Sequence, residues 1–407
     1  MNEQQTQAVT HGTGPLLILA GPGTGKTRTL TARIAYLVQE RQVEARRILA
    51  VTFTNKAAQE MKNRLERQLT PGQAARLNLD TFHGLGLSIL KAEARRFGRN
   101  EDFALIDEHE QLEVIRSLPG VSPRRVSSVR EEISALKRTL KAPQEISESA
   151  KRELFLAYEQ TLQQKNLFDL DDLIHKIVSL FTTHADVLGE YRKRFRWILV
   201  DEYQDINLAQ YRLIRQLACG QLPNLFAIGD PNQAIYGFRG ADAGFINRFL
   251  NDYPEATLLD LSRSYRCSQT ILQASTQVLA DCAKPNAIQG IEGGVRIRMM
   301  ENPTDRSEAE MIARRIEDMM GGLRFFSMDS SISEGSTTEG IRSLADFAVL
   351  CRINRQMKVL EEAFRNHSIP FQTVGETPFF NSEPVKSLID LVRLGVKDNP
   401  VLRAIVL

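Results

Sequence analysis

A glycine-rich segment near the N-terminus, Ala20 to Thr27, contains the residue types that bind a chain of phosphates. It follows an apolar block, Leu16 to Ala20, and precedes a helical pattern, Lys26 to Gln39, which is the setting of a phosphate-binding loop. Small residues let successive backbone N–H groups turn toward an anion, and a helix N-terminus adds a favourable dipole. The residues predicted to line the loop are Gly21, Gly23, Thr24, Gly25, Lys26 and Thr27.

Side chains at two places could act on a bound nucleotide. Lys26 can neutralise the β and γ phosphates, and Thr27 offers a hydroxyl to Mg²⁺, which prefers oxygen ligands. Asp201 and Glu202 follow the apolar block Trp197 to Val200, so both carboxylates leave a buried strand at its carboxyl end, where ligands bind in open α/β sheets. We expect Asp201 to hold Mg²⁺ and Glu202 to orient and deprotonate the attacking water. Together these groups predict nucleotide hydrolysis.

Short blocks rich in Leu, Ile and Val predict the strands that position these groups. The blocks are Leu16 to Ala20, Ile48 to Val51, Leu77 to Asp80, Trp197 to Val200 and Leu225 to Ile228. Helical patterns lie between several of them, at Lys26 to Gln39, Lys56 to Leu69 and Leu208 to Ala218. This alternation builds right-handed βαβ units, so we predict an α/β domain made of residues 1–84 and 194–254.

The segment between the two parts of this domain, residues 85–193, has helical periodicity and few strand-like blocks, which predicts a helical insertion. Its basic residues are assigned to a solvated helix face, because charge runs usually keep helices wet. They are Arg124, Arg125, Arg130, Lys137, Arg138 and Lys141.

A second alternation of apolar blocks and helical patterns predicts another α/β domain over residues 255–407. Its expected strands are Thr257 to Leu261, Val295 to Met300, Phe347 to Cys351 and Phe371 to Val374.

Composition excludes several other classes of protein. The chain has 407 residues, of which 42% are hydrophobic, so it is neither a disordered tail nor a small disulfide-stapled scaffold. Its 52 basic and 50 acidic residues leave a formal charge of +2, which identifies no partner. The four cysteines form no Cys-x-x-Cys pair, which suggests neither a zinc site nor a disulfide framework. Because no apolar run is long enough for a membrane helix, we expect no membrane partner and a cytoplasmic location.

Further motifs indicate what the hydrolysis drives. They are Val51 to Ala58, Thr81 to Gly84, Val200 to Asp205, Ile228 to Ala241 and Ser264 to Cys267. Together with the phosphate loop, and in this order and spacing, they closely resemble the superfamily-1 helicases of the UvrD, PcrA and Rep family. The resemblance covers nearly the whole chain and implies an α/β fold: a RecA-like P-loop NTPase domain with a helical insertion, followed by an incomplete second RecA-like domain.

The resemblance also implies the cofactors ATP and Mg²⁺ and assigns further roles around the nucleotide. Gln5 matches the glutamine that reads adenine, and Arg28 and Tyr265 match residues that sandwich the base. Gln233 would sense the γ phosphate and couple it to DNA. Arg266 would reach across from the second domain as an arginine finger, whose forked donors suit the charge that develops on a transferred phosphoryl group.

A track for single-stranded DNA is expected along the same loops. Phe53, Tyr236 and Phe238 match or adjoin aromatic family positions, and stacking on a ring binds bases without reading sequence. Most relatives carry tryptophan at the position of Phe238, and any single aromatic is more often a core residue. Other residues could contact DNA or support the loops: Thr52, Asn55, Thr81, His83 and Arg239.

The expected function is therefore that of an ATP-dependent DNA helicase that moves 3′ to 5′ on single-stranded DNA and unwinds duplex at junctions of single and double strands. Its direction rests on the resemblance alone, and accessory repair or replication proteins are possible partners. The chain ends before the family's last two motifs, so we expect it to be an N-terminal fragment. Two alternatives stay open: a nucleotide- and DNA-binding module with impaired turnover, and a P-loop ATPase switch directed at a protein.

Overall fold

The computed structural model describes residues 1–220, 223–279, 288–292, 296–320 and 343–374, with 385, 387–389 and 391–392. The chain divides into two compact units, Met1–Arg296 and Ile297–Leu407. In the described part of the chain, no helix has the length and apolar character needed to cross a membrane.

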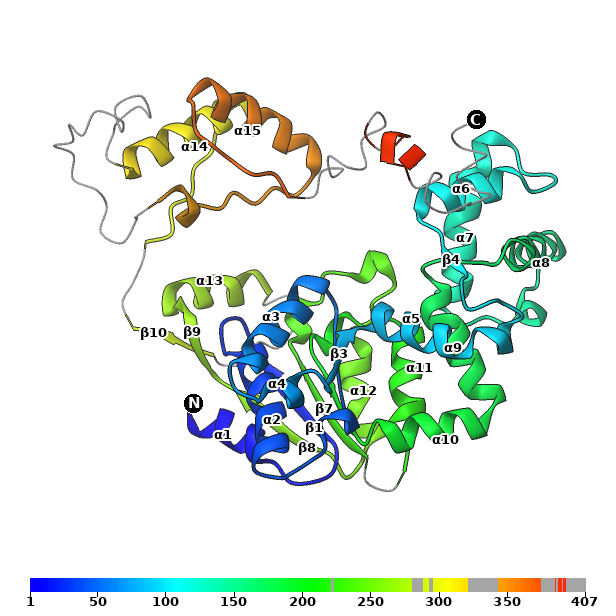
Figure 1. The fold of residues 1–407 in the computed structure, drawn as a ribbon. Helices are drawn as coiled ribbons and strands as arrows, with labels where there is room; N and C mark the ends of the chain where they lie inside the picture. The colour runs from blue at the N-terminus through cyan, green and yellow to red at the C-terminus, as the bar shows by residue number, and fades with distance from the viewer. Residues whose placement is uncertain are drawn as a thin grey trace. The chain divides into compact units, whose positions relative to one another are not determined.

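The first unit is built around a parallel sheet of six strands in the order β3-β2-β6-β7-β1-β8 (Figure 1). The strands are β1 (Leu16–Ala20), β2 (Ile48–Thr52), β3 (Asn78–Thr81), β6 (Trp197–Val200), β7 (Asn224–Gly229) and β8 (Thr257–Leu261). Since all the pairs are parallel, the loops after β1, β7 and β6 leave one edge of the sheet as neighbours.

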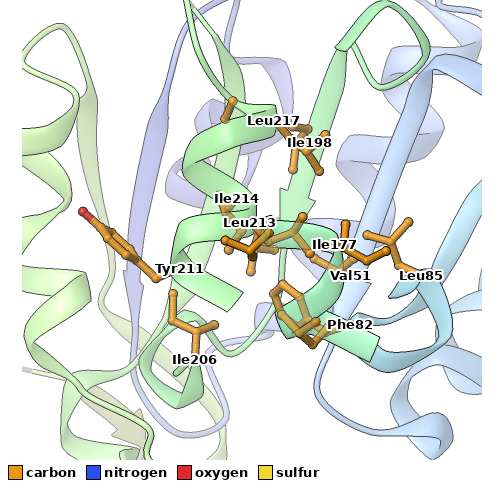
Figure 2. Packing of buried hydrophobic residues seen from close by; sticks show 14 of the residues in the cluster. Val51, Phe82, Leu85, Ile177, Ile198, Ile206, Tyr211, Leu213, Ile214 and Leu217 are labelled. Carbon is orange, nitrogen blue, oxygen red and sulfur yellow. The ribbon is translucent and has the colours of Figure 1, made fainter. Parts of the chain in front are cut away.

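Alternate residues of each strand face opposite sides of the sheet, which creates two apolar layers. Leu16, Ile18 and Ala20 belong to one layer, where α2 (Lys26–Gln39) and α3 (Asn55–Glu66) cover the sheet. Leu17 belongs to the other layer. There α5 (Phe82–Glu93), α9 (Asp172–Thr183), α10 (Ala185–Arg194), α11 (Leu208–Leu217) and α12 (Gly244–Asp252) supply the covering side chains, several of which Figure 2 shows.

The five strands predicted for the first domain all form, within one or two residues of the expected bounds. Thr257 to Leu261 also forms a strand, but it does not pair where it was expected, among the strands of the second α/β domain. This strand, β8, pairs with β1 from Leu16↔Thr257 to Ala20↔Leu261 and so completes the first sheet. Apolar blocks indicate strands but carry no information about which neighbour they pair with, so the sequence could not separate these two placements.

The predicted helical insertion is present. Besides α5, α9 and α10 it contains α6 (Glu108–Arg116), α7 (Val126–Arg138) and α8 (Ser149–Gln164). A two-residue parallel pair, β4 (Ala104–Leu105) with β5 (Leu167–Phe168), joins the segment before α6 to the segment after α8. The remaining helices of the first unit are α1 (Glu3–Thr10), α4 (Pro71–Ala74) and α13 (Gln269–Leu279), and a second small pair joins β9 (Arg263–Ser268) to β10 (Gln289–Ile291).

One of the six basic residues assigned to a solvated helix face is buried instead. Lys137, on α7, is 0% exposed. Its Nζ lies 2.7 Å from Asp169 Oδ2, 2.8 Å from Asp172 Oδ1 and 2.7 Å from Glu159 Oε1. We call these four residues the Lys137 cage. The prediction was wrong for Lys137 because its three partners come from α8, the turn after β5 and α9, which lie 22 to 35 residues away in sequence.

The described residues of the second unit are mainly helical. In it α14 (Asp305–Met319) and α15 (Asn354–Asn366) pack side by side (Figure 1). Their packing includes Ala313, Ile316 and Phe364. Strands were expected at Val295 to Met300, Phe347 to Cys351 and Phe371 to Val374. Val295 lies outside the described residues, and the other residues of these three segments have no strand structure. A strand forms only by pairing with a neighbour, and Leu350, 95% exposed, shows that its segment is not covered.

Candidate nucleotide-binding site

The loop between β1 and α2 has the geometry that its glycines predict. Gly23 and Gly25 have φ angles of 73° and 89°, in the left-handed region that residues with a Cβ rarely adopt. Gly25 caps the N-terminus of α2, so the free N–H groups of that helix open at the loop. The buried Thr24 hydroxyl donates to Gly21 O at 2.8 Å and braces the loop from within. The loop therefore presents backbone donors to an anion.

Arg266 lies beside this loop. The Tyr265 N–H donates to Gly23 O at 2.8 Å, and a Cβ placed on Gly23 would lie 2.5 Å from Arg266 Cβ. Both residues belong to β9, which is part of the first compact unit. Arg266 was expected to reach across from the second domain, and in this structure a backbone hydrogen bond ties its strand directly to the phosphate loop.

The residues expected around the base lie at the same end of the sheet. Gln5 is buried, and its Nε2 donates to Thr24 O at 2.9 Å. Gln5 is held there by the capping box that begins α1, in which its Oε1 accepts from the Asn2 N–H. Tyr265 and Arg28 are exposed, and the Arg263 guanidinium lies 5.6 Å from the Tyr265 ring centroid. The amide and both exposed side chains flank the loop.

Lys26 connects the phosphate loop to the loop after β7. Its Nζ donates to Ala20 O at 3.2 Å and to Gln233 Oε1 at 3.3 Å. The Gln233 Nε2 in turn donates to Asp230 Oδ2 at 2.7 Å. The predicted catalytic lysine and the predicted γ-phosphate sensor are therefore in contact.

Asp201 and Glu202 stand at the carboxyl end of β6, as predicted. The pKa of Asp201 is raised to about 7, chiefly by burial. The charge of the neighbouring Glu202 also raises this pKa, by more than the charge of Lys26 lowers it. Glu202 itself has φ 49° and ψ 50°, a left-handed backbone that is unusual for a residue with a side chain. Its N–H donates to Asp201 Oδ1 at 3.1 Å. Strained backbones of this kind concentrate at functional sites.

The donor set at this edge fits a hard divalent cation. Asp201 is a buried carboxylate with a raised pKa, which means that positive charge in its surroundings does not balance it. The Thr27 hydroxyl, one residue beyond Lys26 in the first turn of α2, is a second oxygen donor. Mg²⁺ binds such oxygens and is commonly held by one or two protein groups plus substrate phosphates.

Three aromatic side chains expected on a DNA track lie together. The rings of Phe53 and Tyr236 stack with centroids 4.7 Å apart, and those of Tyr236 and Phe238 are 6.1 Å apart. Phe238 is 78% exposed, so it is not a core residue. The loops after β2 and β7 therefore form one aromatic surface, which we call the aromatic platform: Phe53, Tyr236 and Phe238.

The other predicted DNA contacts divide into exposed and buried groups. Asn55 and His83 are exposed in the first turns of α3 and α5. Thr52 and Thr81 are buried at the ends of β2 and β3, and the Thr81 hydroxyl accepts from the Gly84 N–H at 3.0 Å to cap α5. These two positions favour loop support over direct contact. The side chain of Arg239 lies outside the described residues.

Sequence reasoning missed two residues that link the predicted ones. Asp230 holds Gln233, and Gln204 bonds both to Glu202 and to the Asp230 backbone. Asp230 directly follows β7, and Gln204 lies in the short turn Tyr203–Asp205 that follows β6 and the acid pair. A polar residue at the carboxyl end of a parallel strand is the signal that could have identified them.

The site brings together the kinds of groups that binding a polyanion and acting on it would need. It combines backbone donors and Lys26 with buried carboxylates and the nearby Arg266, all around the loops after β1, β6, β7 and β8. A cationic and N–H-lined loop facing an acid pair suits the cleavage of a phosphoanhydride by water.

Two family descriptions match the chain. The UvrD/REP helicase N-terminal domain matches residues 1–254, and the UvrD-like helicase C-terminal domain matches residues 259–404. The division between them falls close to the expected boundary at residue 254, whereas the compact units divide at Arg296.

Similar curated proteins agree with this assignment. The chain is 36% identical over 417 aligned positions to the ATP-dependent DNA helicase PcrA of Staphylococcus aureus strain COL, covering 98% of this chain and 54% of that protein. It is 37% identical to the protein of the same description from Staphylococcus epidermidis, with the same coverage. The chain thus spans about half the length of these relatives. From the matched domains and from the phosphate loop, acid pair and aromatic motifs in their places, the chain belongs to the UvrD/REP family of superfamily-1 helicases.

Proposed function

We propose that this chain binds ATP with Mg²⁺, hydrolyses it, and uses the hydrolysis to move on single-stranded DNA in the 3′ to 5′ direction and to unwind duplex at junctions. The observation that carries the proposal is the contact of Lys26 Nζ with Gln233 Oε1 at the edge where Asp201 and Glu202 emerge. Relatives described as ATP-dependent DNA helicases support the substrate and the partner. The cytoplasmic location expected from the sequence is part of the same proposal, as are accessory repair or replication proteins.

Binding would place the triphosphate on the loop between β1 and α2. The backbone N–H groups and Lys26 would hold the phosphates, while Gln5, Arg28 and Tyr265 would hold the base. Gln5 is poised for this role because its donation to Thr24 O uses only one of the two N–H groups on its amide nitrogen. Bound Mg²⁺, held by Thr27 and Asp201, would neutralise phosphate charge.

Hydrolysis requires a water, a base and stabilisation of the charge that develops on the phosphoryl group. Glu202 would accept a proton from the attacking water as the new bond to the γ phosphorus forms and the bond to the bridging oxygen breaks, releasing ADP and phosphate. Lys26 and Arg266 would stabilise the charge on the transferred group. The position of Arg266 beside Gly23 supports this role.

The aromatic platform would couple this site to DNA. Gln233 and Tyr236 belong to the same loop after β7 and are three residues apart in sequence. A change in the contacts of Gln233 could therefore shift a ring that would stack on a base. Stacking on a ring is worth about 1–3 kcal/mol per base and is indifferent to sequence, as a translocating motor requires.

The test compares two substitutions in the full chain. Lys26→Ala should weaken binding of a non-hydrolysable ATP analogue by about 2 kcal/mol or more, roughly 30-fold, because it removes a charge partner of the phosphates. Glu202→Gln should leave that affinity unchanged and lower hydrolysis by about 10²- to 10⁴-fold, the usual contribution of a general base. Lys62→Ala, on the exposed face of α3, is the matched control and should change neither.

Each measurement is made with and without single-stranded DNA. Hydrolysis that DNA stimulates supports the proposal. Hydrolysis that ignores DNA would favour a protein-directed switch, and binding of both ligands without turnover would favour a binding module. Equal loss of affinity in both variants would contradict the separate roles of Lys26 and Glu202.

A further inference from the structure

Gln204 is buried in the centre of the candidate site, although no step above uses it. It is 1% exposed and lies in the short turn Tyr203–Asp205 that follows the acid pair. Its Oε1 accepts from the Asp230 N–H at 2.9 Å. Its Nε2 donates to Glu202 Oε2 at 2.9 Å and to Asp205 Oδ2 at 3.3 Å.

The orientation of this amide is fixed by its partners. A backbone N–H can only donate, so the Gln204 oxygen must face Asp230 and the nitrogen must face the two carboxylates. Rotating the amide by half a turn would set its oxygen against the oxygens of Glu202 and Asp205. The Gln204 side chain therefore holds one definite arrangement, and Glu202 Oε2 is held with it.

The end of β7 is shaped to admit this side chain. A Cβ placed on Gly229 would lie 2.6 Å from Gln204 Oε1 and 3.2 Å from the Gln204 backbone nitrogen. A larger residue at 229 would push the amide away from the Asp230 N–H. The fit joins the loop after β6 to the loop after β7.

A continuous chain of contacts passes through this amide. Lys26 donates to Gln233, Gln233 to Asp230, and the Asp230 N–H to Gln204, which donates to Glu202. One end of the chain is the lysine that would touch the phosphates, and the other end is the carboxylate that would activate water. The backbone of Glu202 is left-handed, a strained conformation that persists only when surrounding contacts hold it. The hydrogen bond from Gln204 is one such contact on its side chain.

We propose that Gln204 is a positioning residue for the reaction: it orients the Glu202 carboxylate toward the attacking water and makes that orientation depend on the Asp230–Gln233 contact. The inference rests on the proposed role of Glu202. Gln204 touches neither nucleotide nor water in this scheme and acts only through its neighbour.

The test uses Gln204→Met, which keeps length and volume but removes the amide. We expect kcat for ATP hydrolysis to fall by about 10- to 100-fold with KM and analogue affinity within about twofold, because only the alignment of the base is lost. The matched control is Gln210→Met. Gln210 is also a buried glutamine and closes the capping box of α11, so its loss tests the cost of removing a buried amide outside the chain of contacts.

A double-mutant cycle separates positioning from a general effect on the fold. If Gln204 acts through Glu202, adding Gln204→Met to Glu202→Gln should cause no further loss of kcat. Multiplicative losses, or an equal loss in Gln210→Met, would overturn the inference.

A second measurement needs no turnover. Affinity for Mg·ADP with aluminium fluoride, which mimics the transferring phosphoryl group with its in-line water, should fall in Glu202→Gln and Gln204→Met, while affinity for Mg·ADP alone should not. If Glu202→Gln loses this discrimination and Gln204→Met keeps it, the inference fails and the proposed function stands. If wild type itself shows no discrimination, the proposed function fails, and the inference fails with it.

Discussion

Lys26 and Lys137 both lie near several carboxylates, but their surroundings are opposite in kind. Lys137 is sealed in the insertion, where Asp169, Asp172 and Glu159 lie within 2.8 Å of its Nζ. Lys26 donates to one backbone oxygen and one amide oxygen, and the nearby Asp201, Asp205 and Asp230 lie beyond direct ion pairing.

The pKa values follow this difference. Burial lowers the pKa of Lys137, but its three carboxylates outweigh burial and raise it well above the usual range. For Glu159 burial acts in the opposite direction and raises the pKa, but Lys137 and Lys176 outweigh burial and lower the pKa to about 2. In the candidate site burial wins, and the pKa values of Asp201 and Asp205 rise to about 7 and about 6. Burial and the neighbouring Asp169 raise the pKa of Asp172 in the cage as well. The clearer difference is therefore one of contact: the cage pairs its lysine directly with carboxylates, whereas the site keeps its lysine and acids apart.

Breaking the Lys137 cage should have the largest effect on stability. Lys137→Met leaves buried carboxylates without their cation, which should lower the free energy of unfolding by about 3–5 kcal/mol. Urea denaturation followed by circular dichroism measures this change. The control Lys141→Met, on an exposed residue just after α7, should cost less than about 0.5 kcal/mol. A cost below about 1 kcal/mol for Lys137→Met would show that the cage is not a closed ion network.

The buried, unpaired charge of Asp201 in the candidate site should make the free energy of unfolding depend on pH. The pKa of Asp201 is about 7 in the folded chain against 3.8 as its ordinary value, so the native state binds more protons between these values. Without nucleotide and Mg²⁺, the free energy of unfolding should therefore fall as pH rises from about 4 to 7, by up to about 4 kcal/mol. Asp205 contributes in the same direction.

Asp201→Asn removes the charge and should flatten this slope while raising stability at pH 8. Denaturation curves at several pH values measure it, with Asp186→Asn, on an exposed aspartate of α10, as the control. A slope that is unchanged in Asp201→Asn would show that this carboxylate is balanced as fully as those of the cage.

The smallest expected effect concerns the aromatic rings, which differ between the same two regions. Phe168 in the insertion is buried against Phe97 and Phe103, whereas Phe238 is exposed. Phe238→Ala should weaken binding of single-stranded DNA by about 1–3 kcal/mol and leave DNA-free nucleotide affinity unchanged. Fluorescence anisotropy with labelled oligonucleotides measures this, and Ile235→Ala, which removes an exposed side chain without a ring, is the control. Equal DNA affinity in wild type and Phe238→Ala would remove this ring from the proposed track.

The sequence predicted the parts whose signal is local. The phosphate loop needs only a strand, small residues and a helix start within eight positions, so both its place and its shape could be inferred from Ala20 to Thr27. The five strands of the first domain were found because each is a short apolar block. Residue patterns alone could not predict that Lys26 meets Gln233, because 207 residues separate the two. Only the family resemblance, which assigns both residues to the phosphates, implied that they lie close together.

What escaped prediction depends on long-range pairing. The apolar block of β8 looks the same whether it closes the first sheet or opens another, and only its ladder with β1 decides. Lys137 looks like its exposed neighbours until three acids from other elements surround it. Gln204 carries a common polar side chain, and its role emerges from the orientation that Asp230 imposes.

The placement of β8 in the first sheet also determines how accurately Arg266 is positioned beside the phosphate loop. Five paired residues register β8 against β1, and the phosphate loop grows from the end of one strand while the arginine follows five residues beyond the end of the other. A slip of one residue would carry the guanidinium ~3.3 Å along the strand axis and turn it to the opposite side. The position of this arginine is thus set by the backbone register of β8. An insertion or deletion between 257 and 266 would shift the guanidinium while leaving every side chain of the phosphate loop unchanged.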